Sequence, residues 1–228
     1  MPLEKITTGR QGETKRGYDD ACGTAHGLEL IGERWALLVL RELMLGPRRF
    51  SQLRADLPGI SANVLTQRLT ELEQRGLVRR TRLPPPASVQ VYEATEWGLE
   101  AEPIVQTLGR WAARSPRHDP TLPISGVSIL LSMRTMIDSE RARDLDAHLN
   151  FRFGDDLYTG HLHRGAIEIT RGEHPAPDLS ISGEPQALAG VLYGKAPLGL
   201  IEWRGDHALL ERVIDLYHLP EKAPLPGH

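Results

Sequence analysis

A proline-rich segment in the middle of the chain limits its folding more than any other feature. Residues 115–123 include Pro116, Pro120 and Pro123, and proline lacks the amide hydrogen that a continuing helix needs. The segment therefore predicts a linker between two domains. The predicted organisation is a flexible tail over 1–18, a first domain over 19–115, a linker over 116–124, a second domain over 125–219 and a tail over 220–228.

The charge of the chain changes at the same place. Although the net charge of the 228 residues is −3, residues 46–86 carry eight arginines against three acidic residues. A basic window in an acidic protein is the electrostatic footprint of a nucleic-acid contact. A solvated helical face has the same composition, so charge alone favours that simpler interpretation.

Composition excludes several classes of protein. Hydrophobic residues make up 40% of the chain and charged residues 25%, as in ordinary globular proteins. No run of about 18 apolar residues is present, and the N-terminal residues lack the apolar core of a secretory signal. The one cysteine, Cys22, cannot form an internal disulfide. We therefore expect a cytoplasmic protein that makes no membrane contact.

The first domain alternates helix signals with tight turns. Apolar spacing predicts helices over 34–45, 51–57 and 61–75. Ser51 and Ser61 stand where N-caps of the second and third helices are expected, because a hydroxyl there accepts a hydrogen bond from a free amide of the first turn. The two capped helices form a helix-turn-helix pair.

The pattern changes after Gly76, a residue suited to the left-handed end of a helix. Residues 77–82 and 89–94 predict two strands of a hairpin. Thr95 predicts the cap of a last helix that extends to about Ala113. The order helix, helix, helix, hairpin, helix is that of a winged helix-turn-helix domain.

The third helix has two distinct faces. Leu65, Leu69 and Leu72 share one sector and are expected in the core, whereas amides and hydroxyls point away from it. Such side chains suit base edges in the major groove, and a surface face selected only for helix stability would more often hold Glu and Lys. The predicted DNA contacts are Arg48, Arg49, Ser51, Ser61, Asn63, Thr66, Gln67, Arg68, Thr70, Arg79, Arg80 and Arg82.

Residues 20–113 resemble HxlR-type winged-helix regulators of the MarR-like superfamily. The resemblance is carried by CGTAHGLELIGERW at 22–35, LLVLREL at 37–43, GPRRFSQL at 46–53, PGIS at 58–61, VLTQRL at 64–69 and LEQRGLV at 72–78. It implies a homodimer whose terminal helices form the interface, a third helix in the major groove and a wing along the DNA backbone. Gly23 and Glu33 depart from the usual residues, and neither removes an expected DNA contact.

Cys22 has two interpretations. In some HxlR-type proteins a cysteine at the corresponding place senses electrophiles or oxidants, and a thiol near a helix N-terminus has a lowered pKa. Asp19 and Asp20 directly precede it and oppose a thiolate. A small buried side chain is the simpler interpretation, and the sequence favours it.

The second domain is predicted to be α+β, with an antiparallel sheet and helices packed on one face. The pattern gives a helix over 127–137, strands over 145–153, 157–162, 166–170 and 179–182, and helices over 184–193 and 206–217. Residues 125–218 resemble the sterol carrier protein type-2-like domain through LNFRF at 149–153, GAIEITRG at 165–172, PDLSISG at 177–183 and WRGD at 203–206.

The resemblance implies an apolar cavity between sheet and helices that holds a small molecule. The alternative is a well-packed domain without a cavity, which stabilises a dimer or keeps the protein soluble. The candidate wall residues are Met133, Phe151, Phe153, Leu192, Leu198, Ile201 and Trp203. Each of them is equally suited to an ordinary core.

Other chemistry has little support. His148, His161 and His163 invite a metal hypothesis, but no cysteine and no clear acidic partner stands at ligand spacing. Asp206 is better explained as an N-cap than as a catalytic acid, and no nucleophile elbow or phosphate loop is present. We predict no metal, no cofactor and no enzymatic activity.

These observations predict a transcription regulator. Its first domain is expected to bind double-stranded operator DNA as a homodimer, and its second to bind an apolar effector or to stabilise the assembly. The alternative is a carrier of apolar ligands whose winged helix mediates protein contacts. A third interpretation is a thiol redox switch at Cys22.

Overall fold

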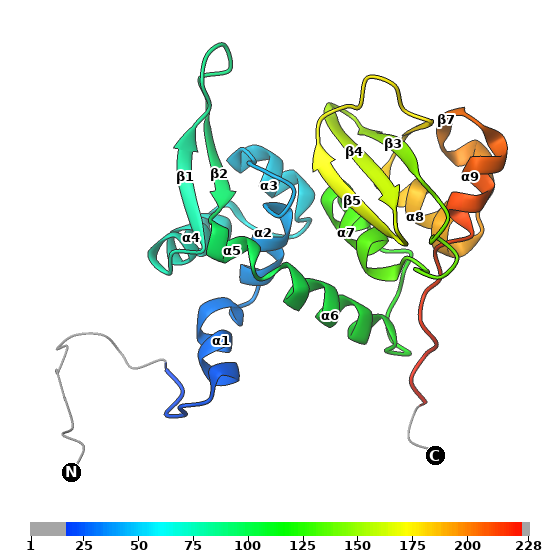
Figure 1. Cartoon of the computed structure of the whole chain (residues 1–228). Coiled ribbons are helices and arrows are strands. Elements are labelled where there is room, and N and C mark those ends of the chain that lie inside the picture. Colours follow the sequence, from blue (N-terminus) through cyan, green and yellow to red (C-terminus); the bar gives the residue numbers. More distant parts are fainter. Residues whose placement is uncertain (1–16, 225–228) are drawn as a thin grey trace, which may run out of the picture.

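The computed structural model describes residues 17–224. The predicted tail over 1–18 therefore lies almost wholly outside the described residues, as do the last four residues of the chain. Figure 1 shows two bodies side by side, with helix α6 running from the first toward the second. Within the described residues, no helix is both long enough and apolar enough to cross a membrane.

The first body has the order of elements expected of a winged helix-turn-helix domain, with two differences. Its elements are α1 (Gly23–Ile31), α2 (Ala36–Glu42), α3 (Phe50–Asp56), α4 (Ala62–Gln74), β1 (Val78–Arg82), β2 (Gln90–Ala94), α5 (Glu96–Leu99) and α6 (Glu102–Ala113). Apolar spacing did not predict α1. The single last helix expected from Thr95 is divided into α5 and α6, because Pro103 in the first turn of α6 cannot donate a hydrogen bond to the preceding turn.

Local capping signals explain most of these boundaries. Ser61 accepts a hydrogen bond from the Val64 amide at 3.3 Å, and Thr95 caps α5. Gly76 has a φ of +76°, as its place after α4 requires. The cap predicted at Ser51 is wrong. Helix α3 begins one residue earlier, because the Gln52 side chain accepts a hydrogen bond from the Arg49 amide at 2.9 Å.

The second body is α+β. Its elements are α7 (Gly126–Met136), β3 (Ala147–Phe153), β4 (Asp156–His163), β5 (Ala166–Arg171), β6 (Leu179–Ser182), α8 (Pro185–Gly194), the short 3-10 helix η1 (Leu198–Leu200), β7 (Glu202–Gly205) and α9 (His207–Ile214). Asp206 caps α9, as expected, by accepting a hydrogen bond from the Ala208 amide. The four-residue strand β7 was not predicted.

The sheet is mixed, so the prediction of an antiparallel sheet is wrong. The strand order is β5-β4-β3-β6-β7, and β3 pairs with β6 in parallel. After β5 the chain returns along the sheet and enters β6 on the other side of β3. Asn150 holds this return segment, because its side-chain amide donates to the His174 carbonyl and its oxygen accepts from the His174 amide, both at 2.9 Å.

Alternation along the strands places the core on one side of the sheet. On β3, Ala147, Leu149, Phe151 and Phe153 are buried, and the helices cover this face (Figure 1). The apolar core continues without interruption from the first body into the second. The two domains therefore pack against each other.

Polar contacts reinforce the junction between the domains. The Ser125 hydroxyl, which caps α7, donates to Glu42 of α2 at 2.9 Å. Arg134 of α7 pairs with Glu102 of α6 at 2.6 Å. Near the C-terminus, Lys222 donates to the carbonyl of Ala113 at the end of α6. These contacts connect α2 and α6 of the first domain to the second domain.

Candidate nucleic-acid interface

The outward face of α4 is accessible. Leu65, Leu69 and Leu72 are buried, as their spacing predicted. The polar side chains predicted on the other side of the helix are exposed, namely Asn63, Thr66, Gln67, Thr70 and Gln74. The leucines therefore fix the helix on the domain while its amides and hydroxyls face the solvent.

Hydrogen bonds already orient part of this face. The hydroxyls of Thr66 and Thr70 donate to main-chain carbonyls one turn earlier, at 2.9 and 3.0 Å. The Gln67 amide donates to Glu71 at 2.9 Å. The threonine oxygens keep acceptor capacity, and the Gln67 oxygen remains available to a donor on a base.

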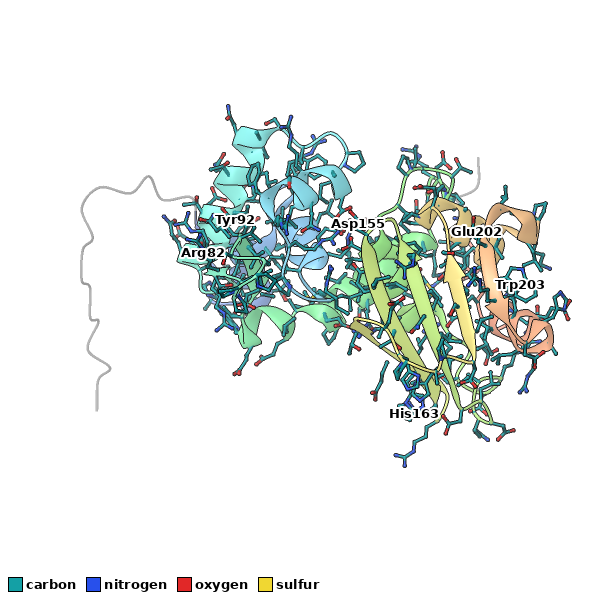
Figure 2. The ribbon with its side chains drawn as sticks, turned by 90° about the horizontal axis from the view of Figure 1, so that it is seen from above. Arg82, Tyr92, Asp155, His163, Glu202 and Trp203 are labelled. Atoms are coloured by element: carbon teal, nitrogen blue, oxygen red, sulfur yellow. The ribbon has the colours of Figure 1, made fainter. Side chains whose placement is uncertain are left out.

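The wing carries the exposed cations. Arg79, Arg80 and Arg82 lie on β1 and are exposed, and Figure 2 shows Arg82 on the side of the first domain away from the second. Arg79 pairs with Glu93 across the hairpin at 2.7 Å, and Arg82 donates to the Ser88 carbonyl at 3.0 Å. Ion pairs this exposed are weak, so these guanidiniums can exchange partners for phosphates.

Arg48 is not part of this surface, and its prediction as a DNA contact is corrected. Its side chain is only 2% exposed and donates to Asp56 of the first domain and to Asp156 of the second. Burial alone would lower the pKa of Arg48, but its hydrogen bond to Asp156 and the nearby charges raise that pKa above its usual value. Figure 2 shows Asp155, beside Asp156, at the side of the sheet that faces the first domain.

Arg68 is also largely withdrawn from the solvent. Its side chain is 11% exposed and pairs with Glu71 and, at 3.6 Å, with Glu33. It braces α4 rather than extending from it. The other predicted contacts, Arg49, Ser51 and Ser61, are exposed near the starts of α3 and α4.

A second exposed surface is apolar. On α6, Ile104, Leu108 and Trp111 lie three or four residues apart on one stripe, and Trp111 is 71% exposed. Leu28 of α1 is also exposed. Large exposed apolar stripes are typical of protein interfaces.

Cys22 is the N-cap residue of α1 and is exposed, so its interpretation as a small buried side chain is wrong. Hydrogen bonds from the amide and side chain of Thr24 lower the pKa of the thiol. Its environment therefore lowers the pKa of the thiol despite the nearby aspartates.

The seven candidate wall residues of the second domain form core rather than an apolar cavity. Met133 and Phe151 have no exposed surface, and Phe153, Leu192 and Ile201 are buried, while Leu198 and Trp203 pack against the same core. Phe151 and Trp203 border a groove of about 360 Å³ that is lined mainly by polar residues. A more apolar groove, of about 640 Å³, lies between the domains.

The three histidines form part of a stacked column on the solvent side of the sheet. Ring centroids are 4.3 Å apart for His148 and His161, 4.4 Å for His161 and His163, and 3.9 Å for His148 and His174. An acidic partner does exist, because Asp146 lies 2.7 Å from His161. Among residues 17–224, no group of three or more potential ligands is arranged to hold a metal ion.

Comparison with known proteins identifies the first domain. Residues 30–119 match the HxlR-like helix-turn-helix family. The uncharacterized HTH-type transcriptional regulator YkvN of Bacillus subtilis (strain 168) is 42% identical over 94 residues, which are 40% of this chain and 77% of that protein. The HTH-type transcriptional regulator YodB of the same organism is 39% identical over 83 residues, which are 36% of this chain and 74% of that protein.

Among solved structures, the reduced form of YodB from B. subtilis is 34% identical and covers 43% of this chain and 98% of its own, with a TM-score of 0.38. The sequence matches span most of the length of these relatives, all of which are transcriptional regulators. Through its N-terminal domain, this chain belongs to the HxlR-like helix-turn-helix family of transcriptional regulators.

Proposed function

We propose that this protein is a sequence-specific DNA-binding regulator that acts as a homodimer. The observation that carries the proposal is the exposed polar face of α4, fixed from behind by three buried leucines and flanked by an arginine-bearing wing. An amphipathic helix of this kind fits the major groove, where base edges present distinct patterns of donors and acceptors.

The N-terminal half of α4 reads the bases in this proposal. Asn63 and Gln67 present amides, which pair with two atoms of adenine, and Thr66 lies between them on the same face. Arg49, Ser51 and Ser61, which are exposed at the starts of α3 and α4, contact phosphates in this proposal. Arg79, Arg80 and Arg82 follow the DNA backbone beside the helix.

The apolar stripe on α6 is the dimer interface in this proposal. One winged-helix domain covers few base pairs. Two such domains related by a twofold axis contact half-sites about 34–36 Å apart. Ile104, Leu108 and Trp111 supply apolar surface that a second copy would remove from water. Leu28 of α1 extends the same kind of surface to the other terminal helix.

In this proposal the second domain binds a small-molecule effector. Contacts with α2 and α6 connect this domain to the winged-helix domain. An effector acts only if it binds one arrangement of the two winged-helix domains better than another. A carrier of apolar ligands, with no DNA partner, is the competing function.

The decisive experiment replaces Asn63 and Gln67 with alanine and measures affinity for the DNA upstream of the protein's own gene. We expect a loss of at least about tenfold, since one good bidentate contact contributes about 1–3 kcal/mol. Gln74→Ala, an exposed glutamine at the other end of α4, is the matched control and is expected to bind nearly as wild type. Unchanged affinity in the double variant would favour the carrier.

The interface is tested separately by sedimentation. Replacing Ile104 and Trp111 with glutamate is expected to produce monomers with weakened DNA binding, because the charges would be buried at the interface. Leu200→Glu, at an equally exposed leucine of the second domain, serves as the control. A dimer that survives the double substitution would place the interface elsewhere.

A further inference from the structure

The groove between the domains differs from the cavity expected inside the second domain. It has a volume of about 640 Å³, and both domains line it. Helices α2 and α6 contribute from the first domain, and α7 and α8 contribute from the second. Residues 117–120 and 122–124 of the linker and Leu219 complete the lining. The volume falls in the range of small-molecule sites.

Most of the lining is apolar, and part of it is in contact with solvent. Leu131 and Met136 of α7 and Ala189 of α8 belong to the lining, and Leu108 and Leu122 are large apolar side chains that remain about half exposed or more. A ligand that covered them would gain the free energy of removing apolar surface from water. The groove therefore suits a molecule with an apolar body.

A few polar groups are placed within this apolar surface. The hydroxyls of Ser132 and Tyr193 form a hydrogen bond of 2.8 Å, and burial raises the pKa of Tyr193 to about 12, so its hydroxyl stays protonated. Only one of these hydroxyls can donate in their shared bond. The other retains its hydrogen for a ligand acceptor.

The lining contains two arginines, Arg41 and Arg117, and one histidine, His118. Arg117 and His118 are exposed, and Arg41 is paired with Glu42 at 2.6 Å. Among the lining residues that the structure describes, Asp119 is the only acidic one, and Thr121 already donates two hydrogen bonds to it. In residues 17–224 no acidic side chain pairs with Arg117. The groove therefore offers an unneutralised cation to an anionic group.

We propose that this groove binds an apolar small molecule that carries one carboxylate. The apolar body lies against α6 and α7, and the carboxylate faces Arg117 and His118. Leu108 belongs both to the groove and to the exposed stripe of α6, so an occupant touches the helix that carries the proposed dimer interface. Binding stands independently of the proposed function, whereas its regulatory consequence rests on that function.

The test is calorimetric titration of the full chain with 4-phenylbutyrate and with neutral 4-phenylbutanamide, which has the same size and apolar part. We expect the carboxylate to bind about tenfold more tightly, because hydrogen bonds to charged groups are stronger than neutral ones. Replacing Arg117 and His118 with glutamine is expected to remove this preference. Both residues are exposed, so the fold should tolerate the change.

A second pair of variants tests the place of binding. Ala112→Trp fills the groove from α6 and is expected to abolish binding. Trp203→Ala, at the polar groove on the sheet, is the control and is expected to bind as wild type. Equal affinity for acid and amide, retained binding in Ala112→Trp, or no binding at millimolar concentrations overturns the proposal. If neither compound binds and Ala112→Trp weakens the dimer, the occupant is a second copy and the proposal is wrong.

DNA affinity measured with and without 4-phenylbutyrate separates this site from the proposed function. A change in affinity supports both the site and its regulatory role. Binding of the carboxylate without any change in DNA affinity supports the site and overturns its regulatory role. Binding by a chain that shows no DNA affinity at all supports the site and contradicts the proposed function.

Discussion

The domain junction and the wing use the same side chain in opposite ways. At the junction, Arg48 is buried between Asp56 and Asp156, so its charge is satisfied by protein on both sides. On the wing, Arg79 and Arg80 are more than half exposed and have at most one weak partner each. The basic segment is thus two structures: a buried cross-domain contact and a charged surface open to a ligand. Substitutions in the two regions should affect different properties.

The largest effect is expected at the junction. Arg48→Met removes the cation that lies between Asp56 and Asp156, although Arg171 still pairs with Asp156 at 2.8 Å. Loss of one partner from a buried ion pair costs about 3 kcal/mol. We expect the free energy of unfolding, measured by urea denaturation, to fall by about that amount. The adjacent exposed residue gives the control, because Arg49→Met should change stability by less than about 0.5 kcal/mol. Equal stability of the two variants would show that Arg48 contributes nothing to the junction.

The wing is expected to affect binding and not folding. Replacing Arg79, Arg80 and Arg82 with glutamine removes up to three phosphate contacts from each protomer of the proposed dimer. The slope of log affinity against log salt concentration should become shallower by about 0.9 for each contact, or by up to about 5.4 for the dimer. Arg212→Gln, in α9 of the second domain, is the control. An unaltered slope with reduced affinity would mean that these arginines act other than through phosphates.

A smaller effect is expected from Glu42, which burial gives a raised pKa despite hydrogen bonds from Arg41 and Ser125. Since the folded state holds this proton more tightly than the unfolded chain, its stabilising contribution is present below the ordinary pKa of 4.5 and is lost as pH rises through the folded-state pKa. Glu42→Gln has no titrating group at this position, so the variant should not lose stability in this way as pH rises. The unfolding free energies of wild type and variant should therefore diverge between pH 4 and pH 8.

The titration of Asp156 does not contribute to the difference expected between wild type and Glu42→Gln over this pH range. Partial burial would raise its pKa, but hydrogen bonds from Arg48 and Arg171 lower it below 3.8. Its stabilising contribution is therefore present above the ordinary pKa and is lost only as pH falls through the lower folded-state value. Parallel stability curves for wild type and Glu42→Gln across pH 4 to pH 8 would contradict the prediction for Glu42.

The smallest effect is expected at Cys22, which belongs to neither region. Thr24→Val removes the hydroxyl that helps to lower the thiol pKa, so alkylation of Cys22 by iodoacetamide at pH 7 should become slower. Stability and DNA affinity should stay unchanged. A change in DNA affinity on alkylation would support the redox interpretation of Cys22.

Short-range patterns in the sequence determined much of the secondary structure of the winged-helix domain and which face of α4 is exposed. The spacing of Leu65, Leu69 and Leu72 defines which face of α4 is buried, and hence which polar side chains are exposed. The caps at Ser61 and Thr95 follow from residues within one helical turn. These features depend on neighbours a few residues away, so they are readable without tertiary contacts.

Tertiary structure alone decided the junction. Arg48 meets Asp156 across 108 residues, and Glu42 meets Ser125 across 83. The spacing of residues along one helix or strand does not indicate partners so distant in the sequence. Arg48 therefore could not be distinguished from the other arginines of the basic window. The parallel pairing of β3 with β6 and the groove between the domains depend likewise on how distant segments return to each other. Periodicity indicates which side of an element faces a core, whereas the identity of the opposing surface is fixed only when the two domains pack.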